Sequence, residues 1–92
     1  MGAQAEVTTA ALGISRADQD AYAAASHARA LAARDRGRLA REIVPVAGAR
    51  GASVTEDEGI RADSTVDRLA GLRPAFTPDG TITAGNASQL SD

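Results

Sequence analysis

The stretch 15-SRADQDAYAAASHARALAARDRG-37 decides the fold, because it carries the clearest helical signal in the chain. Ser15 is a good N-cap residue, and Asp18 follows three positions later, close to a capping-box arrangement. The residues in between are rich in alanine and contain no glycine or proline, and Gly37 provides a stop. We therefore predict one long helix over residues 16–36.

Small residues recur along one side of this predicted helix. Tyr22, Ser26, Ala30 and Ala33 are spaced by four, four and three positions, so they form a narrow stripe. Because small side chains allow a close approach, we expect this stripe to pack against another element.

The segments on either side of the helix give weaker signals. Residues 3–12 (AQAEVTTAAL) are weakly helical, and Gly13 can end that helix. Residues 41–46 (REIVPV) contain a β-branched run and are typical of a short strand, with Pro45 at an edge-type position. Residues 47–53 (AGARGAS) have the composition of a flexible loop.

The C-terminal third predicts another helix and strand after an acidic loop. Ser64 or Asp63 can cap a short helix that ends near Gly71. A Pro-Asp-Gly turn at 78–80 is followed by a predicted strand at 81–84. The chain is therefore expected to be α+β, with one long helix, short helices and two or three short strands.

Length and composition limit the core. A chain of 92 residues suffices for one small domain. It has one Phe, one Tyr, one Met and no Trp, and much of its 43% hydrophobic content is alanine. Alanine contributes little burial energy, since the hydrophobic effect scales with buried apolar area. The fold is expected to be marginal or to depend on additional protein.

Charge and cysteine content exclude several classes of protein. The net charge of −2 does not indicate a nucleic-acid partner, which would normally require a basic surface. With no cysteine, the 92 residues contain no disulfide, thiolate nucleophile or cysteine metal ligand. No apolar run approaches the length of a membrane span, and the N-terminus lacks the pattern of a secretion signal. We expect a cytoplasmic protein without a membrane partner.

No catalytic or metal site is evident from residue spacing. His27 is the single histidine and is interpreted as a surface or packing residue. The acidic run 56–58 does not match a calcium loop, and none of the serines has a base arranged beside it. The segment 85–88 (GNAS) is more informative, because small residues between a strand and a helix start let a ligand approach the backbone. The same pattern also serves ordinary strand-to-helix turns.

Four blocks of sequence together resemble the thiolase family, the acetyl-CoA acetyltransferases and 3-ketoacyl-CoA thiolases. These blocks are MGAQAE (1–6), GISRADQDAYAAASHARA (13–30), GRLAREIVPV (37–46) and LRPAFTPDGTITAGNASQLSD (72–92). Their order and spacing cover essentially the whole chain, and the last block is the most specific.

The resemblance implies a position within a longer protein. Residues 1–79 correspond to part of the thiolase loop domain, an α/β excursion from the N-terminal half. Residues 80–92 correspond to the strand that returns to the N-terminal thiolase domain and to the start of its next helix. On this basis Met1 is expected to be an internal methionine and the chain an internal fragment.

The family's reaction is acyl transfer from coenzyme A thioesters, by thiolysis or Claisen condensation of 3-ketoacyl-CoA. It proceeds through an acylated cysteine and also uses a histidine and a second cysteine. None of these residues lies in this chain, so it has no expected catalytic residue and should be inactive alone. Acyl-CoA is the implied substrate, with no covalently bound cofactor and no metal. The family's members are homo-oligomers, dimers or tetramers.

The resemblance also implies contacts with coenzyme A. Arg61 corresponds to an arginine near the adenine and phosphate end, Phe76 to an aromatic along the pantetheine arm, and Ser88 to a serine that hydrogen-bonds the pantetheine amide. Ala84 and Ala87 correspond to small residues lining the pantetheine tunnel, and Met1 to a methionine in the acyl or pantetheine pocket.

Two departures from the family pattern bear on these expectations. Many members have a small polar residue where this chain has Arg68, which alters the expected nucleotide contact. The ending ASQLSD resembles the ketoacyl-CoA-degrading branch. An alternative of a different class stays open: a non-catalytic CoA-binding or protein-interaction module derived from a thiolase.

Overall fold

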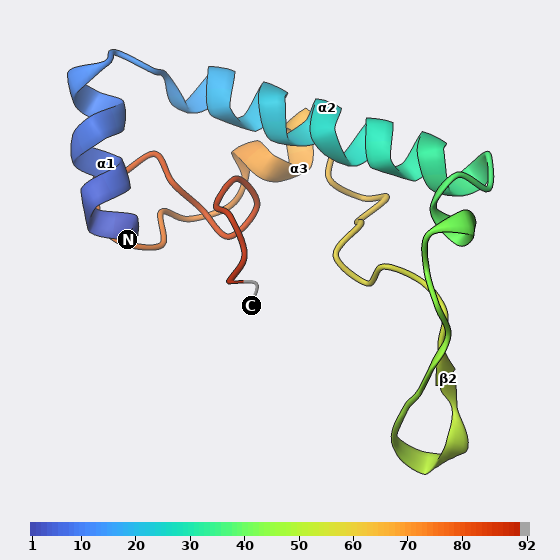
Figure 1. The fold of residues 1–92 in the computed structure, drawn as a ribbon. Coiled ribbons are helices and arrows are strands. Elements are labelled where there is room, and N and C mark those ends of the chain that lie inside the picture. The colour runs from blue at the N-terminus through green and yellow to red at the C-terminus, as the bar shows by residue number, and fades with distance from the viewer. Residues whose placement is uncertain (91–92) are drawn as a thin grey trace.

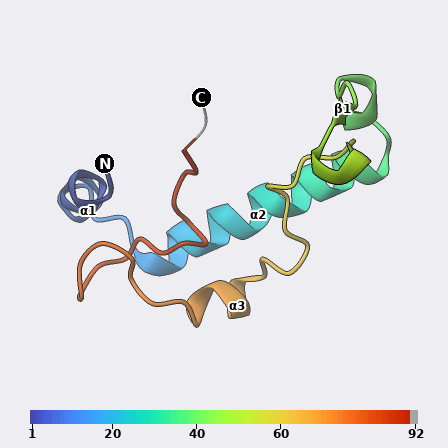
Figure 2. The ribbon, with the colours of Figure 1, turned by 90° about the horizontal axis from the view of Figure 1, so that it is seen from below.

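The structure is a computed structural model that describes residues 1–90; residues 91 and 92 lie outside the described part. The long helix α2 (Arg16–Asp35) is the central element of the structure, and α1 (Gly2–Ala11) lies at one end of it. A hairpin of β1 (Val46–Ala47) and β2 (Ser53–Val54) projects from the other end. The short helix α3 (Val66–Ala70) lies against α2, as both ribbon views show (Figures 1 and 2).

The long helix confirms the prediction made from its local signals. It begins at Arg16, and the backbone N–H of Asp18 donates to the Ser15 hydroxyl at 3.1 Å. It ends at Asp35, and Gly37 adopts φ 75°, a left-handed conformation that glycine adopts without strain. The Ser15 cap and the glycine stop therefore act as the sequence predicts.

The predicted packing stripe on α2 is wrong at its N-terminal half. Tyr22 is 76% exposed and Ser26 is also exposed, whereas Asp20 is buried. The reason is that the buried contact of α2 with residues 81–88 runs through polar Asp20, which accepts hydrogen bonds from Arg16 and Asn86. The spacing of small residues does not predict a contact made by hydrogen bonds to the Asp20 carboxylate.

The strand predicted at 41–46 is wrong except at its last residue, Val46. Its first residue belongs to the 3-10 helix η1 (Leu39–Arg41), and the N–H groups of Glu42 and Ile43 donate to Leu39 O. Strand pairing begins only at β1, after Pro45, which has no N–H to donate. The 3-10 helix and the turn after it therefore end at Glu42, and Ile43 and Val44 lie outside any helix or strand.

The predicted flexible loop at 47–53 contains the hairpin turn. Val46 pairs with Val54 and Ala47 with Ser53 in antiparallel register. The connecting 3-10 helix η2 (Ala49–Gly51) includes Arg50 at φ 62° and Gly51 at φ 77°. The small residues at this position thus shape a tight turn.

The last part of the chain keeps its predicted turn but lacks the strand at 81–84. The N–H of Gly80 donates to Thr77 O at 3.1 Å, which closes the Pro-Asp-Gly turn. Beyond it, the only β pairing in the described part is an isolated bridge between Pro74 and Thr83. The short helix ends at Ala70, with Gly71 as its C-cap, close to the predicted end near Gly71; Thr65 caps its start in place of Ser64 or Asp63.

Polar contacts connect these elements. The Glu6 carboxylate on α1 accepts the backbone N–H groups of Thr81 at 2.9 Å and Ile82 at 2.7 Å. The Arg16 guanidinium on α2 donates to the carbonyls of Leu69 and Leu72, at the C-terminal end of α3. These bonds tie α1 and α3 to the rest of the chain.

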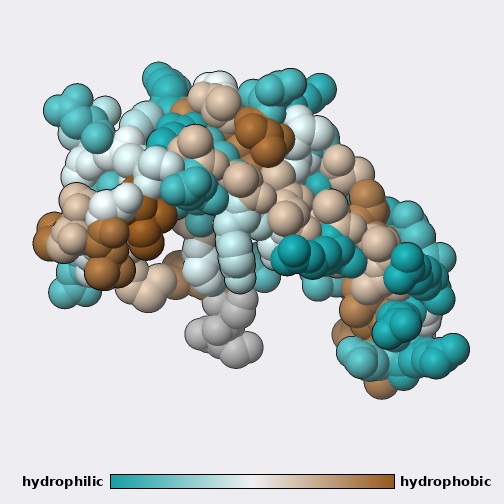
Figure 3. Space-filling model, turned by 90° about the horizontal axis from the view of Figure 1, so that it is seen from above, coloured by the Kyte–Doolittle hydropathy of each residue, from teal (hydrophilic) through white to brown (hydrophobic). Residues whose placement is uncertain are grey.

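The buried apolar core is very small. Among residues 1–90, Leu69 and Ile82 are the buried hydrophobic side chains. Val7 and Leu12 on α1 and Val46 in the hairpin are exposed, and Figure 3 shows apolar surface at both ends of the molecule. In the described part of the chain, no helix is long and apolar enough to span a bilayer.

Candidate functional site

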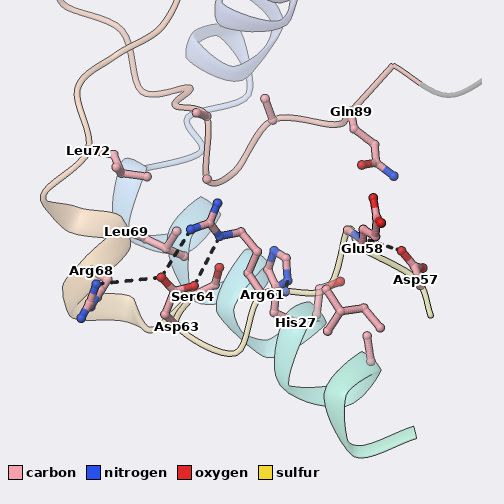
Figure 4. A pocket seen from close by; sticks show the side chains of 17 residues that line it. His27, Asp57, Glu58, Arg61, Asp63, Ser64, Arg68, Leu69, Leu72 and Gln89 are labelled. Carbon is pink, nitrogen blue, oxygen red and sulfur yellow. Dashed lines mark hydrogen bonds and ion pairs between the residues drawn. The ribbon is translucent and has the colours of Figure 1, made fainter. Parts of the chain in front are cut away.

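A pocket of about 730 Å³ lies between α2, α3, the loop before α3 and the C-terminal segment (Figure 4). His27 from α2 and Leu69 from α3 contribute to its walls, and Ala84, Gly85 and Ala87 come from the C-terminal segment. Four segments that are distant in sequence therefore meet at this site.

Two arginines and one aspartate form the basic side of the pocket. Arg61 Nε lies 3.3 Å from Asp63 Oδ1, and Arg61 Nη2 lies 3.4 Å from Asp63 Oδ2. Arg68 Nη1 approaches Asp63 Oδ2 at 3.9 Å. Figure 4 shows Asp63 between the two arginines. The site thus carries two guanidinium groups with one shared carboxylate.

The Arg61–Asp63 pair changes the acidity of both groups. Hydrogen bonding from Arg61, reinforced by its positive charge, lowers the pKa of Asp63. The same hydrogen bond and the carboxylate charge raise the pKa of Arg61. Both groups are therefore held in their charged forms, as an anion-binding arginine would require.

His27 fixes the position of the loop that carries Arg61. The backbone N–H of Arg61 donates to His27 Nδ1 at 3.1 Å, so this ring nitrogen acts as an acceptor. The contact joins residues 34 positions apart in sequence. His27 consequently places Arg61 beside α2, a role that no local sequence pattern indicates.

The opposite end of the pocket is acidic. Asp57 and Glu58 lie at this end together with Gln89, away from the two arginines (Figure 4). Asp57 Oδ1 accepts the N–H of Gly59 at 2.8 Å, which closes the local turn. The pocket therefore presents opposite charges at its two ends.

Small residues form the surface between these ends. A Cβ atom added at Gly85 would collide with the side chains of Leu69 and Leu72. Ala84 and Ala87 stand on either side of this position in the pocket lining. Larger side chains at these three positions would reduce the space in the pocket.

Asn86 holds this small-residue segment in place. Its Oδ1 accepts the N–H of Thr83 at 2.8 Å. Its Nδ2 donates to Asp20 Oδ1 at 2.9 Å and to Thr81 O at 3.0 Å. The conformation of the segment is therefore fixed from α2 as well as from its own backbone.

A second hollow of about 750 Å³ adjoins the first. Tyr22 and Ser88 line it, and Ser26, His27, Gly85 and Ala87 belong to the linings of both hollows. The Ser88 hydroxyl donates to Gln89 O at 3.2 Å and is exposed. The segment 85–88 therefore separates two neighbouring spaces.

The residues expected to contact coenzyme A divide into two groups. Arg61, Ala84 and Ala87 line the first hollow, and Ser88 lines the second. Met1 is 81% exposed and lies outside both linings. Phe76 also lies outside them, with its ring against Gly2. Half of the expected set thus lines one pocket.

The sequence does not predict the contacts of two polar residues of this site. It indicates Asp63 only as a helix cap and Asn86 only as part of a turn. The interpretation of His27 as a surface or packing residue agrees with its contact to the Arg61 backbone. Asp63 had the strongest available signal, because it lies two positions after Arg61 with opposite charge. Within residues 1–90, no three His, Cys, Asp or Glu side chains lie close enough to hold a metal ion.

The fold and site define an α+β segment with an open pocket that is basic at one end and floored by small residues. Residues 1–92 match the family model described as Thiolase, N-terminal domain. The chain belongs to the thiolase family, as its four sequence blocks predict.

Curated relatives agree with this assignment. The chain is 52% identical over 96 residues to a probable acetyl-CoA acetyltransferase of Mycolicibacterium smegmatis, covering 100% of this chain and 25% of the relative. It is 50% identical over 97 residues to a 3-ketoacyl-CoA thiolase of Shigella boydii, again covering 100% of this chain and 25% of the relative. The chain thus spans about a quarter of the length of these relatives.

Solved structures share the backbone arrangement. The dimeric peroxisomal thiolase of Saccharomyces cerevisiae superposes with a TM-score of 0.92 at 45% identity, covering 100% of this chain and 24% of that chain. The acetyl-CoA acetyltransferase of Bacillus anthracis gives a TM-score of 0.89 at 44% identity, covering 98% of this chain and 24% of that chain. These similarities extend over both ends of the elongated structure.

Proposed function

We propose that this chain is a coenzyme A-binding segment of a thiolase-family acyltransferase that acts on acyl-CoA. The observation that carries the proposal is the convergence of Arg61, Ala84 and Ala87 on one pocket. Coenzyme A is a polyanion with a thin pantetheine arm. A guanidinium complements its phosphates, and small residues leave room for its arm.

The residues of this chain contribute binding and not the covalent step. Thiolase chemistry requires a cysteine nucleophile, and these 92 residues contain none. His27 acts as an acceptor for the Arg61 backbone, so its observed role is to position the loop. We therefore assign no catalytic residue to residues 1–92, and acyl transfer would use cysteines supplied by other polypeptide.

We further propose that residues 1–79 form part of a loop domain and residues 80–92 belong to the N-terminal thiolase domain. The large exposed surface supports this arrangement, because the exposed side chains on α1 and in the hairpin offer contacts to additional protein. Homo-oligomerisation is proposed for the assembled enzyme, and the yeast structural neighbour is dimeric. A cytoplasmic location stays a prediction.

A chimaeric enzyme tests the proposed function. These 92 residues would replace the matching segment of the Mycolicibacterium smegmatis relative, and cleavage of acetoacetyl-CoA would be assayed. We expect the chimaera to be active and Ala87→Leu to raise its KM for CoA at least about tenfold, because a bulky side chain would narrow both hollows. Ala28→Leu, on an exposed face of α2 and outside both pocket linings, is the matched control.

Each outcome of this assay tests a different part of the proposal. A folded chimaera without activity would contradict the assignment as an acyltransferase segment. An active chimaera with an unchanged KM for Ala87→Leu would contradict the proposed CoA site. The 92-residue chain alone should give no turnover, and turnover above a blank would contradict its assignment as non-catalytic.

A non-catalytic CoA-binding or interaction module is the second candidate function. The polar network around Asn86, which gives the pocket a defined shape without other protein, favours it. A cooperative thermal transition of the isolated chain, with a midpoint raised by CoA, would support this candidate.

A further inference from the structure

We propose that Arg68 is a specificity-determining residue that makes the pocket select ligands bearing a terminal phosphate monoester. Applied to coenzyme A, Arg68 would discriminate the intact molecule from its 3′-dephospho form. The inference rests on the proposed function, because it takes the pocket to be a CoA site.

The geometry of the two arginines differs. Arg61 makes two contacts with Asp63, at 3.3 and 3.4 Å, so both oxygens of that carboxylate face its guanidinium. Arg68 makes a single contact at 3.9 Å, and its side chain is 73% exposed. An ion pair this long between exposed groups is weak and is screened by salt. An incoming anion can therefore engage Arg68 without disrupting the Arg61–Asp63 pair.

The charges favour a dianion at this position. Asp63 offsets one of the two guanidinium charges, which leaves a net positive charge on the group of Arg61, Asp63 and Arg68. A phosphate monoester carries about −1.5 to −2 charge near neutral pH, more than a phosphate diester. The planar guanidinium can also donate two parallel hydrogen bonds to phosphate oxygens.

The acidic end of the pocket orients the ligand. Asp57 and Glu58 lie at the opposite end from Arg68 (Figure 4), where they would repel a phosphate group. A ligand with phosphates at one end and an uncharged arm therefore has one favourable direction, with its phosphate monoester toward Arg68. This direction places the arm along Ala84 and Ala87.

Binding of two ligands to the full 92-residue chain tests the inference. Dissociation constants for CoA and 3′-dephospho-CoA would be measured by calorimetry for the wild type, Arg68→Ser and Arg68→Lys. We expect Arg68→Ser to weaken CoA binding about tenfold, the typical effect of losing one charge-assisted contact, and to change dephospho-CoA binding less than about twofold. Arg68→Lys should give an intermediate loss, because lysine keeps the charge but lacks the planar fork.

Arg73→Ser is the matched control, because Arg73 is an exposed arginine outside the pocket lining and should leave both constants unchanged. Circular dichroism would confirm that each variant keeps its fold. Equal losses for both ligands, or no loss for either, would overturn the role of Arg68 while leaving the CoA site intact. A folded wild-type chain that binds neither ligand would overturn the proposed site and this inference together.

Discussion

Asn86 shows how a single side chain determines the shape of the pocket. It accepts from the N–H of Thr83, a residue with 0% exposure, and donates to Asp20, which is 2% exposed. Its third contact is to the carbonyl of Thr81. A buried hydrogen-bonding group without a partner lowers the stability of the folded state. Asn86 avoids this cost, because it supplies partners to the buried groups of Thr83 and Asp20.

Replacing Asn86 by alanine should strongly destabilise the chain. We expect the free energy of unfolding to fall by about 3 kcal/mol, because the Thr83 N–H and the Asp20 carboxylate would both lose a partner. Urea denaturation without ligand would measure the change. Ser88→Ala is the control, since within residues 1–90 the exposed Ser88 hydroxyl hydrogen-bonds only the neighbouring Gln89 carbonyl, and it should change stability by less than about 0.5 kcal/mol. Equal effects of the two substitutions would contradict this role for Asn86.

At the scale of elements, the Glu6 carboxylate hydrogen-bonds α1 to residues 81 and 82. Glu6 accepts two backbone N–H groups and the Thr81 hydroxyl, and these bonds lower the pKa of Glu6, with the Ile82 N–H having the largest effect. A carboxylate whose pKa is lower when folded stabilises the protein above its unfolded value of 4.5, and this contribution is lost as the pH falls through the folded value. Acid should therefore detach α1.

Glu6→Gln tests this attachment. Between about pH 7 and pH 3, the wild-type Tm should fall as Glu6 is protonated, whereas the variant should start from a lower Tm and lose less of it. The remaining acid sensitivity would include Asp63, whose pKa is also lowered. Thermal unfolding followed by circular dichroism at several pH values provides the measurement. Parallel pH profiles for the two proteins would show that Glu6 does not contribute in its charged form.

Elements whose signals are local could be predicted from the sequence, and an element that depends on a distant contact could not. The long helix follows from Ser15 and Gly37, whose effects are local. The expected strand at 81–84 fails because the Thr81 and Ile82 N–H groups donate to Glu6, 75 and 76 positions away, and not to a neighbouring strand. Local propensity contains no information on such a distant acceptor.

In the candidate site, too, some features can be predicted from the sequence and others depend on contacts between distant segments. The family resemblance places Arg61, Ala84 and Ala87 near one ligand, and the structure brings these three to one pocket. It does not bring Met1 or Phe76 there. The positioning contact from His27 to the Arg61 backbone joins α2 to a distant loop, so only the three-dimensional arrangement reveals it.

At the scale of the whole molecule, the chain is extended and little of it is buried. Its Cα radius of gyration is 15.7 Å, against about 12 Å for a compact domain of this length. Its accessible surface is 7122 Å², against about 5,000 Å² for a compact protein of this mass. Polar bonds from Glu6, Arg16 and Asn86 therefore hold together a chain whose apolar core is centred on Leu69 and Ile82.

Because so little surface is buried on folding, we expect the free energy of unfolding to depend unusually weakly on urea concentration. The fully unfolded chain would expose about 13,500 Å². Folding to the structure therefore buries only about three quarters of the area that a compact domain of this mass would bury. Because the urea m value scales with the area exposed on unfolding, we expect about three quarters of the value of a compact two-state domain of 92 residues. Urea titration of both proteins, with small-angle scattering to measure the radius of gyration, tests this expectation. Equal m values together with a radius near 12 Å would mean that the isolated chain packs more tightly than the arrangement described above.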